Sequence, residues 1–267
     1  MPSSFPQNLS FDLLDDVMFL DSEQREKALS EVKVTEIGPL IEYSIYSDSI
    51  SSIDQSNPIV EAFDASKNGN LVSGIHSFFK SFEFTKGPQS EFDVEDSEWQ
   101  SFLLRSQRAA NAAGIEISMA KAISATIAEM AENIIWHSES VQSSTVGYQY
   151  CDGRFDYVVA DAGIGILKSL KRSPEFSTLR TSTEALLLAV KNGVSRFSDS
   201  KRGTGFNSLV LNLAKRSCDV RFRSGKTSLT FEGVRPYKQS KPPEPVLREC
   251  ADIRGVIISF TCIVPEA

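Results

Sequence analysis

The residue types best suited to chemistry in this 267-residue chain lie in three short motifs in its second half. The first is E-x-x-x-N, formed by Glu129 and Asn133, with His137 four residues further on. On a helix, this spacing places the three side chains one turn apart along one border. There the carboxylate can act as a base for water, and the amide oxygen can bind a hard cation such as Mg²⁺. Taken alone, the same stripe also fits the solvated flank of an amphipathic helix.

The second motif follows an apolar run, which predicts a strand that ends at Asp161. Gly163 and Gly165 come next, followed by Ile166. A carboxylate at a buried strand end can accept a hydrogen bond from an exocyclic amine such as that of adenine. The glycines would let a purine approach the backbone, because no Cβ stands in the way. The alternative is an ordinary turn with a solvated aspartate.

The third motif is a glycine-rich turn that spans residues 202–206. It opens a predicted helix over 205–215, so unpaired N–H groups and the positive end of the helix dipole would favour a phosphate there. Basic side chains are dense in the segment before it, although solvated helix faces would give the same composition. The motif consists of Arg202, Gly203, Thr204, Gly205 and Phe206.

Hydrophobic periodicity predicts the elements that position these motifs. Strands alternate with helices but are joined in part as hairpins, which predicts an α/β two-layer sandwich with a mixed sheet. A hairpin turn is expected at 224–227, and a surface insert at 236–249. The expected elements are a helix from about 107 to 137, strands at 144–150 and 154–160, helices at 166–170, 182–191 and 205–215, and strands at 219–223, 228–232 and 255–264.

Residues 1–95 are predicted to form a small α+β N-terminal region, whose role the sequence does not reveal, and residues 96–267 a second domain. The acidic, poorly periodic stretch 86–97 is the expected connector between them. Helical pieces within the N-terminal region are expected at 22–32, 58–63 and 71–82.

Composition and charge exclude several classes of protein. The formal net charge of -7 lacks the broad excess of Lys and Arg that binding to duplex DNA or to a membrane surface needs, so neither partner is expected. The chain has no basic, apolar leader and no run of about 18 apolar residues, and a cytoplasmic protein is therefore expected. The four cysteines are scattered, which predicts reduced thiols and no zinc site.

In this order, the three motifs resemble the N box and the two glycine boxes of the GHKL ATPases, which share the Bergerat fold. The resemblance covers about residues 105–267 and looks nearest to the histidine-kinase-like and anti-sigma-kinase branch. It implies that Asn133 coordinates Mg²⁺, that Glu129 orients or activates water or a substrate hydroxyl, and that Asp161 binds the adenine amine. The other residues that it assigns to the nucleotide pocket are His137, Gly163, Gly165, Ile166, Arg202, Gly203, Thr204, Gly205 and Phe206.

The resemblance implies an ATP-binding protein, with ATP and Mg²⁺ as cofactors, that hydrolyses ATP slowly. Closure of its lid would signal to a protein partner or to a second copy in a homodimer. Three alternatives stay open: a serine/threonine protein kinase of anti-sigma type, a non-catalytic interaction module that senses nucleotide, and a structural protein that binds no nucleotide. Autophosphorylation on histidine is not expected, because the lone His76 lies outside any recognisable dimerisation helix.

Overall fold

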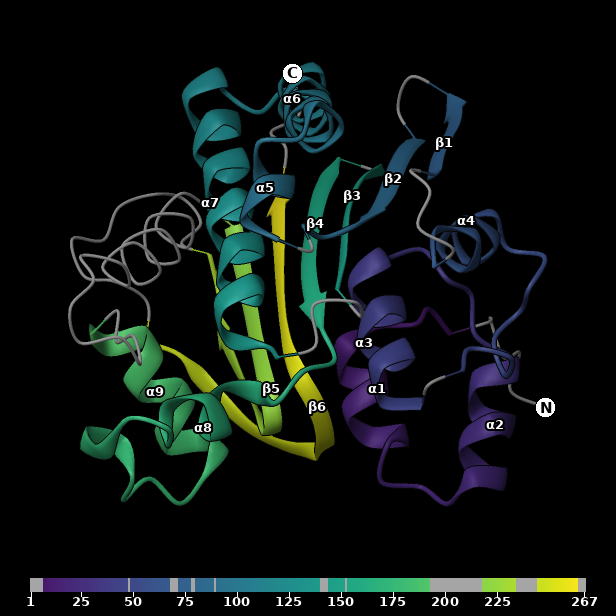
Figure 1. Ribbon diagram of the computed structural model, residues 1–267. Helices are drawn as coiled ribbons and strands as arrows, with labels where there is room; N and C mark the ends of the chain where they lie inside the picture. The colour runs from purple at the N-terminus through teal and green to yellow at the C-terminus, as the bar shows by residue number, and fades with distance from the viewer. Residues whose placement is uncertain are drawn as a thin grey trace.

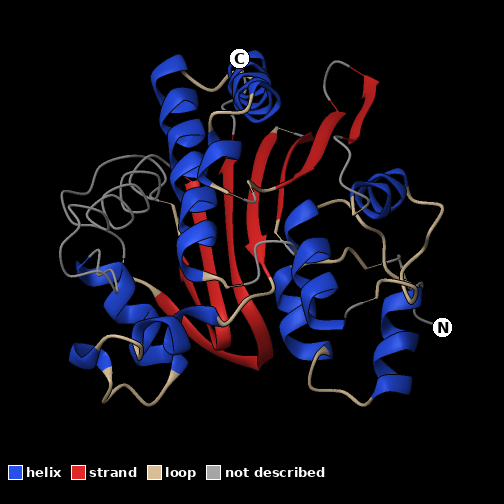
Figure 2. Cartoon of the chain, in the orientation of Figure 1, coloured by secondary structure: helices blue, strands red, loops and turns tan. Residues whose placement is uncertain are grey.

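The computed structural model of the protein contains a six-stranded sheet with helices against both of its faces (Figures 1 and 2). The strands follow the order β1-β2-β3-β4-β6-β5 across the sheet. Every pairing between neighbouring strands is antiparallel, so the expected mixed sheet is wrong for the described strands. The structure describes residues 7–47, 49–67, 72–77, 80–88, 90–139, 144–151, 153–192, 218–233 and 244–263.

The helices are α1 (Phe11–Val17), α2 (Ser22–Ser30), α3 (Ile37–Ser47), α4 (Pro58–Ser66), α5 (Glu91–Val94), α6 (Ser97–Ala112), α7 (Ile117–His137), α8 (Gly165–Leu170) and α9 (Ser182–Asn192). The strands are β1 (Val72–Ser77), β2 (Lys80–Lys86), β3 (Thr145–Cys151), β4 (Arg154–Asp161), β5 (Cys218–Phe231) and β6 (Val246–Ile263). Among the described helices, none combines the length and the apolar composition needed to cross a bilayer.

Alternation along the strands divides the apolar side chains between the two faces of the sheet. On β4, Val159 packs into a core with residues of α6, α7 and α9. The neighbouring Val158 packs into a second core with residues of α1, α3 and α4. The sheet and helices α6 to α9 therefore form the two layers of an α/β protein, as predicted. The N-terminal helices add a further layer on the opposite face.

The long helix expected up to His137 is divided by a turn into α6 and α7. Gly114 ends this turn with φ +103°, a conformation that glycine adopts without the strain other residues would meet. The second helix keeps the predicted apolar stripe, because Ile123, Ile127 and Met130 are all fully buried. This stripe fixes which border of α7 carries the polar residues of the first motif.

The N-terminal region shares the sheet with the rest of the chain. The structure has β1 and β2 where a helix over 71–82 was expected, so that expectation is wrong. Phe82 and Phe84 are buried two residues apart, which is the period of a strand, and β2 pairs with β3 along its length. The boundary predicted near residue 95 falls between α5 and α6.

β5 and β6 form a long two-stranded ribbon at one edge of the sheet. Residues 224–227, where a hairpin turn was expected, are instead an irregularity inside β5, which pairs with β6 on both sides of it. β6 begins at Val246, inside the expected surface insert. Cys218 and Cys262 face each other across the ribbon and form a disulfide, so the expectation of four reduced thiols is wrong.

Candidate functional site

The second motif forms a tight turn between β4 and α8. Asp161 ends β4 and is only 3% exposed. One of its carboxylate oxygens accepts a hydrogen bond from the Gly163 N–H at 2.8 Å. Burial raises the pKa of the Asp161 carboxyl to about 6, although the N–H groups of Gly163 and Val256 partly oppose this shift. Among the described residues, no arginine or lysine forms an ion pair with this carboxylate.

The end of α7 touches this turn directly. The Ile164 N–H donates to the carbonyl of Ser138, one residue beyond α7, at 2.9 Å. A Cβ at Gly163 would lie 2.2 Å from that carbonyl oxygen, so only glycine fits between the strand end and the helix end. The first two motifs are therefore adjacent in space, and Figure 1 shows the chain passing from β4 past the end of α7 into α8.

The polar stripe of the first motif runs along α7 away from this contact. Glu129, Asn133 and His137 are all half-buried. Burial, and then the neighbouring carboxylate of Glu132, raise the pKa of Glu129. At a rise of 1.5 Å per residue, Glu129 lies roughly 13 Å along the helix from the contact at Ser138. A ligand that reaches both Asp161 and Glu129 would have to be elongated.

The remaining residues of the second motif start α8. Gly165 has φ +74°, and a Cβ there would lie 2.9 Å from the hydroxyl oxygen of Ser224 on β5. Ile166 packs against the core formed with α6, α7 and α9. The third motif lies outside the described residues, so its predicted contacts with a phosphate stay predictions. The motif residues concerned are Arg202, Gly203, Thr204, Gly205 and Phe206.

Two residues that were not predicted from the sequence as part of the site hold the turn from the other side. Ser224 accepts a hydrogen bond from the Ile166 N–H at 3.1 Å and donates one to the Gly255 carbonyl at 2.8 Å. Gly255 has φ +70°, and a Cβ there would lie 1.9 Å from the Asp161 carbonyl oxygen. From the sequence, Ser224 was expected in a hairpin turn. The one signal for the close approach of two backbones was Gly255 at the start of the strand expected over 255–264.

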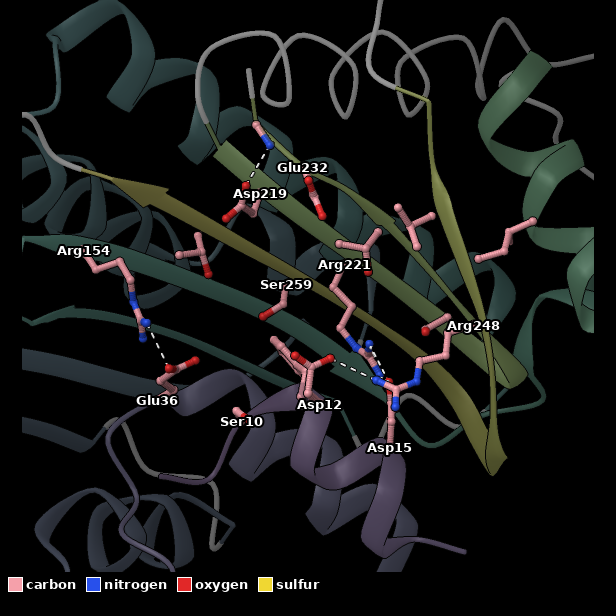
Figure 3. A pocket seen from close by; sticks show the side chains of 17 residues that line it. Ser10, Asp12, Asp15, Glu36, Arg154, Asp219, Arg221, Glu232, Arg248 and Ser259 are labelled. Carbon is pink, nitrogen blue, oxygen red and sulfur yellow. Dashed lines mark hydrogen bonds and ion pairs between the residues drawn. The ribbon is translucent and has the colours of Figure 1, made fainter. Parts of the chain in front are cut away.

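A hollow of about 700 Å³ lies on the opposite face of the sheet from the Asp161 turn, between α1 and the strands β5 and β6 (Figure 3). Both charged and hydroxyl side chains face into it. It is lined by Ser10, Phe11, Asp12, Asp15, Glu36, Arg154, Asp219, Arg221, Ser228, Thr230, Glu232, Gly233, Val246, Leu247, Arg248, Ser259 and Thr261.

Arg221 and Arg248 line this hollow, Arg223 lies two residues after Arg221 on β5, and all three are already paired. Arg221 contacts Asp15 at 2.7 Å and Glu42 at 3.0 Å. The completely buried Arg223 contacts the same two carboxylates, and Arg248 lies 3.5 Å from Asp15. These contacts join α1 and α3 to the ribbon of β5 and β6. The three guanidinium groups therefore serve the packing of the N-terminal layer, and each already has carboxylate partners.

Comparison with protein-family models, with curated proteins and with solved structures finds no match to this chain. Within the described residues, no group of three or more His, Cys, Asp or Glu side chains could hold a metal ion. The geometry at the Asp161 turn is therefore the basis on which a function can be argued.

Proposed function

We propose that the protein binds ATP with Mg²⁺ at the junction of α7 and the Asp161 turn and hydrolyses it slowly. The observation that carries this proposal is the buried Asp161 carboxylate, held at a strand end against glycine backbone. Burial without a paired cation disfavours the charged carboxylate, as its raised pKa reflects. A ligand N–H group would add a further donor to those of the backbone, and the exocyclic amine of adenine is such a group.

Asn133 is the residue that would hold Mg²⁺ in this proposal. Its side chain carries an amide oxygen, which is a suitable ligand for a hard cation, and it is half-buried on the border of α7. One protein ligand is sufficient, because Mg²⁺ is commonly held by one or two protein groups together with nucleotide phosphates and waters. The ion would neutralise charge on the phosphates, whose further contacts we assign to residues 202–206.

Glu129 is the proposed base. A half-buried carboxylate with a raised pKa is better matched to proton transfer at neutral pH than an exposed one. It could take the proton of an attacking water, which gives hydrolysis, or that of a hydroxyl on a protein substrate, which gives a kinase of the anti-sigma type. A site that binds ATP without either reaction would act as a nucleotide sensor for a partner or a second copy.

The first experiment is calorimetric titration with a non-hydrolysable ATP analogue, with and without Mg²⁺. We expect binding that Mg²⁺ strengthens, loss of binding in Asp161→Asn, and loss of the Mg²⁺ effect in Asn133→Ala. The matched control is Asp156→Asn, because Asp156 is equally buried on β4 and faces the N-terminal helices. Folded wild-type protein that takes up no nucleotide would refute the proposal.

Turnover distinguishes the three forms of the proposal. We expect phosphate release from ATP that is at least about 100-fold slower in Glu129→Gln, the size of effect typical of a lost general base. The control is Glu132→Gln, which should slow turnover far less, because Glu132 is exposed on the same helix and contributes only the smaller part of the rise in the pKa of Glu129. With labelled ATP, transfer of the labelled phosphate to a second protein instead of water identifies the kinase. Binding of ATP with neither free phosphate nor a labelled protein as product identifies the sensor.

A further inference from the structure

The hydroxyl of Ser224 bridges the two ends of the Asp161 turn. The residue is 3% exposed and lies in the irregular part of β5. It accepts from the Ile166 N–H in the first turn of α8 and donates to the Gly255 carbonyl on β6. One buried hydroxyl therefore uses both its donor and an acceptor to tie α8 and β6 together.

The α8 end of the bridge supplies a cap that the helix itself lacks. The first N–H groups of a helix have no partner inside it. Ile164, the residue before α8, makes no side-chain capping bond. Ser224 meets this need at Ile166 from a strand 58 residues further along the chain. Without its hydroxyl, an N–H group at the base of the turn would lose its partner.

The β6 end of the bridge fixes the neighbour of Asp161. The Cα of Gly255 lies so close that an added Cβ would be 1.9 Å from the Asp161 carbonyl oxygen and 2.7 Å from a carboxylate oxygen. The next residue, Val256, pairs with Asp161 across the strands, and its N–H opposes the rise in the pKa of that carboxyl. A shift of Gly255 would therefore move the carboxylate.

We infer that Ser224 is a positioning residue that fixes the Asp161 carboxylate for an adenine amine and so makes the site prefer adenine to guanine nucleotides. This inference rests on the proposed function. Adenine presents an N–H donor at the ring position where guanine presents a carbonyl acceptor. A carboxylate held in place accepts from the first and repels the second, whereas one that can shift loses part of this discrimination.

The test compares ATP with GTP by calorimetric titration of the full chain at one Mg²⁺ concentration. In Ser224→Ala, we expect ATP affinity to fall about tenfold, which corresponds to about 1.4 kcal/mol, while GTP affinity changes by less than about twofold. The ATP:GTP ratio is the informative quantity, because a general loosening of the fold would weaken both nucleotides together.

The matched control is Ser228→Ala. Ser228 lies on the same strand and is completely buried, but its hydroxyl is bonded to the Cys250 thiol and lines the hollow on the opposite face. We expect the control to keep the wild-type ATP:GTP ratio. If Ser224→Ala does not fold, Ser224→Cys keeps a side chain of similar shape with only weak hydrogen-bonding capacity, and it should give an intermediate loss of preference.

Two failures are distinguishable. If the wild type binds no ATP, the proposed function is refuted and the role of Ser224 with it. If the wild type prefers ATP while Ser224→Ala keeps the wild-type ATP:GTP ratio, only the positioning role is overturned. Where the alanine variant does not fold, Ser224→Cys takes its place in this comparison. A ratio that falls equally in Ser228→Ala would also overturn it, because the effect would then belong to the ribbon and not to the bridge.

Discussion

The two faces of the sheet treat buried carboxylates differently. Under the N-terminal helices, Asp15 and Glu42 are almost fully buried, and both contact Arg221 and Arg223. On the α7 face, Asp161 is buried to a similar degree but has backbone N–H groups as donors and no arginine or lysine paired with it among the described residues. Arginine pairing uses the acceptor capacity of the first two, whereas Asp161 keeps capacity for a ligand.

Asp156 shows that burial alone does not make a site. It lies on β4 with its side chain toward the N-terminal layer, where Arg154 contacts it at 3.2 Å and the Thr261 hydroxyl donates to it at 2.8 Å. Burial nevertheless raises the pKa of Asp156 to about 6, as it does for Asp161. What distinguishes Asp161 is its place in a glycine turn against the end of α7, and not its pKa.

The largest effect should come from breaking the paired cluster. Arg223→Met removes the charge of a completely buried guanidinium and leaves Asp15 and Glu42 with one arginine fewer. We expect the free energy of unfolding to fall by about 3–5 kcal/mol, the usual cost of an uncompensated buried charge. Urea unfolding measures it. A loss below about 1 kcal/mol would show that the cluster does not hold the N-terminal layer.

A substitution of Asp161 is expected to raise the free energy of unfolding, in contrast to Arg223→Met. Its folded-state pKa of about 6 lies above the ordinary value of 3.8, so its contribution to stability is complete below about pH 4 and is lost as the pH rises through 6. Asp161→Asn should therefore raise the free energy of unfolding at pH 8 by up to about 3 kcal/mol and flatten its pH dependence. Chemical denaturation at pH 5 and pH 8 checks this; a less stable variant with the wild-type pH slope would contradict it.

A smaller effect is expected on nucleotide affinity. An N–H donor favours the ionised carboxylate, and a carboxyl with a pKa of about 6 is about nine-tenths protonated at pH 5. ATP should therefore bind about tenfold more weakly at pH 5 than at pH 7. Titrations at the two pH values measure the ratio. Asp156→Asn should still show the fall in ATP affinity at pH 5. If that fall disappears in Asp156→Asn, the titrating group is on the face of the sheet that carries the N-terminal helices, and the prediction for Asp161 is wrong.

The smallest effect belongs to an exposed pair near the same site. Arg172 pairs with Glu139, just beyond α7, but about half of the arginine side chain is exposed. We expect Arg172→Met to change the free energy of unfolding by less than about 0.5 kcal/mol, because solvent screens such pairs. Urea unfolding beside Arg223→Met gives the contrast directly. Equal losses in the two variants would remove the distinction between buried and exposed pairing.

The elements around Asp161 could be predicted from the sequence because their signals are local. The strand at 154–160, the helix at 182–191 and the apolar stripe with Ile127 are found within a residue or two of where periodicity placed them. An apolar run that ends in an acidic residue followed by glycines predicts both the strand and the turn after it.

What could not be predicted depends on contacts between distant segments. The helix expected over 71–82 covers β1 and the first residues of β2, and only the pairing of β2 with β1 and β3 settles the conformation there. The position of Ser224 beside Ile166 depends on how β5 lies next to α8. Arg221 and Arg223 alternate with apolar residues as any half-exposed strand would, and their burial follows from helices far earlier in the chain.

The shared sheet also limits how this chain can change over evolutionary time. A domain can be transferred between genes by recombination when it can be cut from its neighbour without exposing a hydrophobic core. Here the pairing of β2 with β3 and the apolar core formed with α1, α3 and α4 both cross the predicted boundary near residue 95. A descendant that inherited only the later part would present a bare strand edge at β3 and the apolar side of Val158 and Ile257 to solvent. The two parts are therefore expected to be inherited together, with new sequence added in loops.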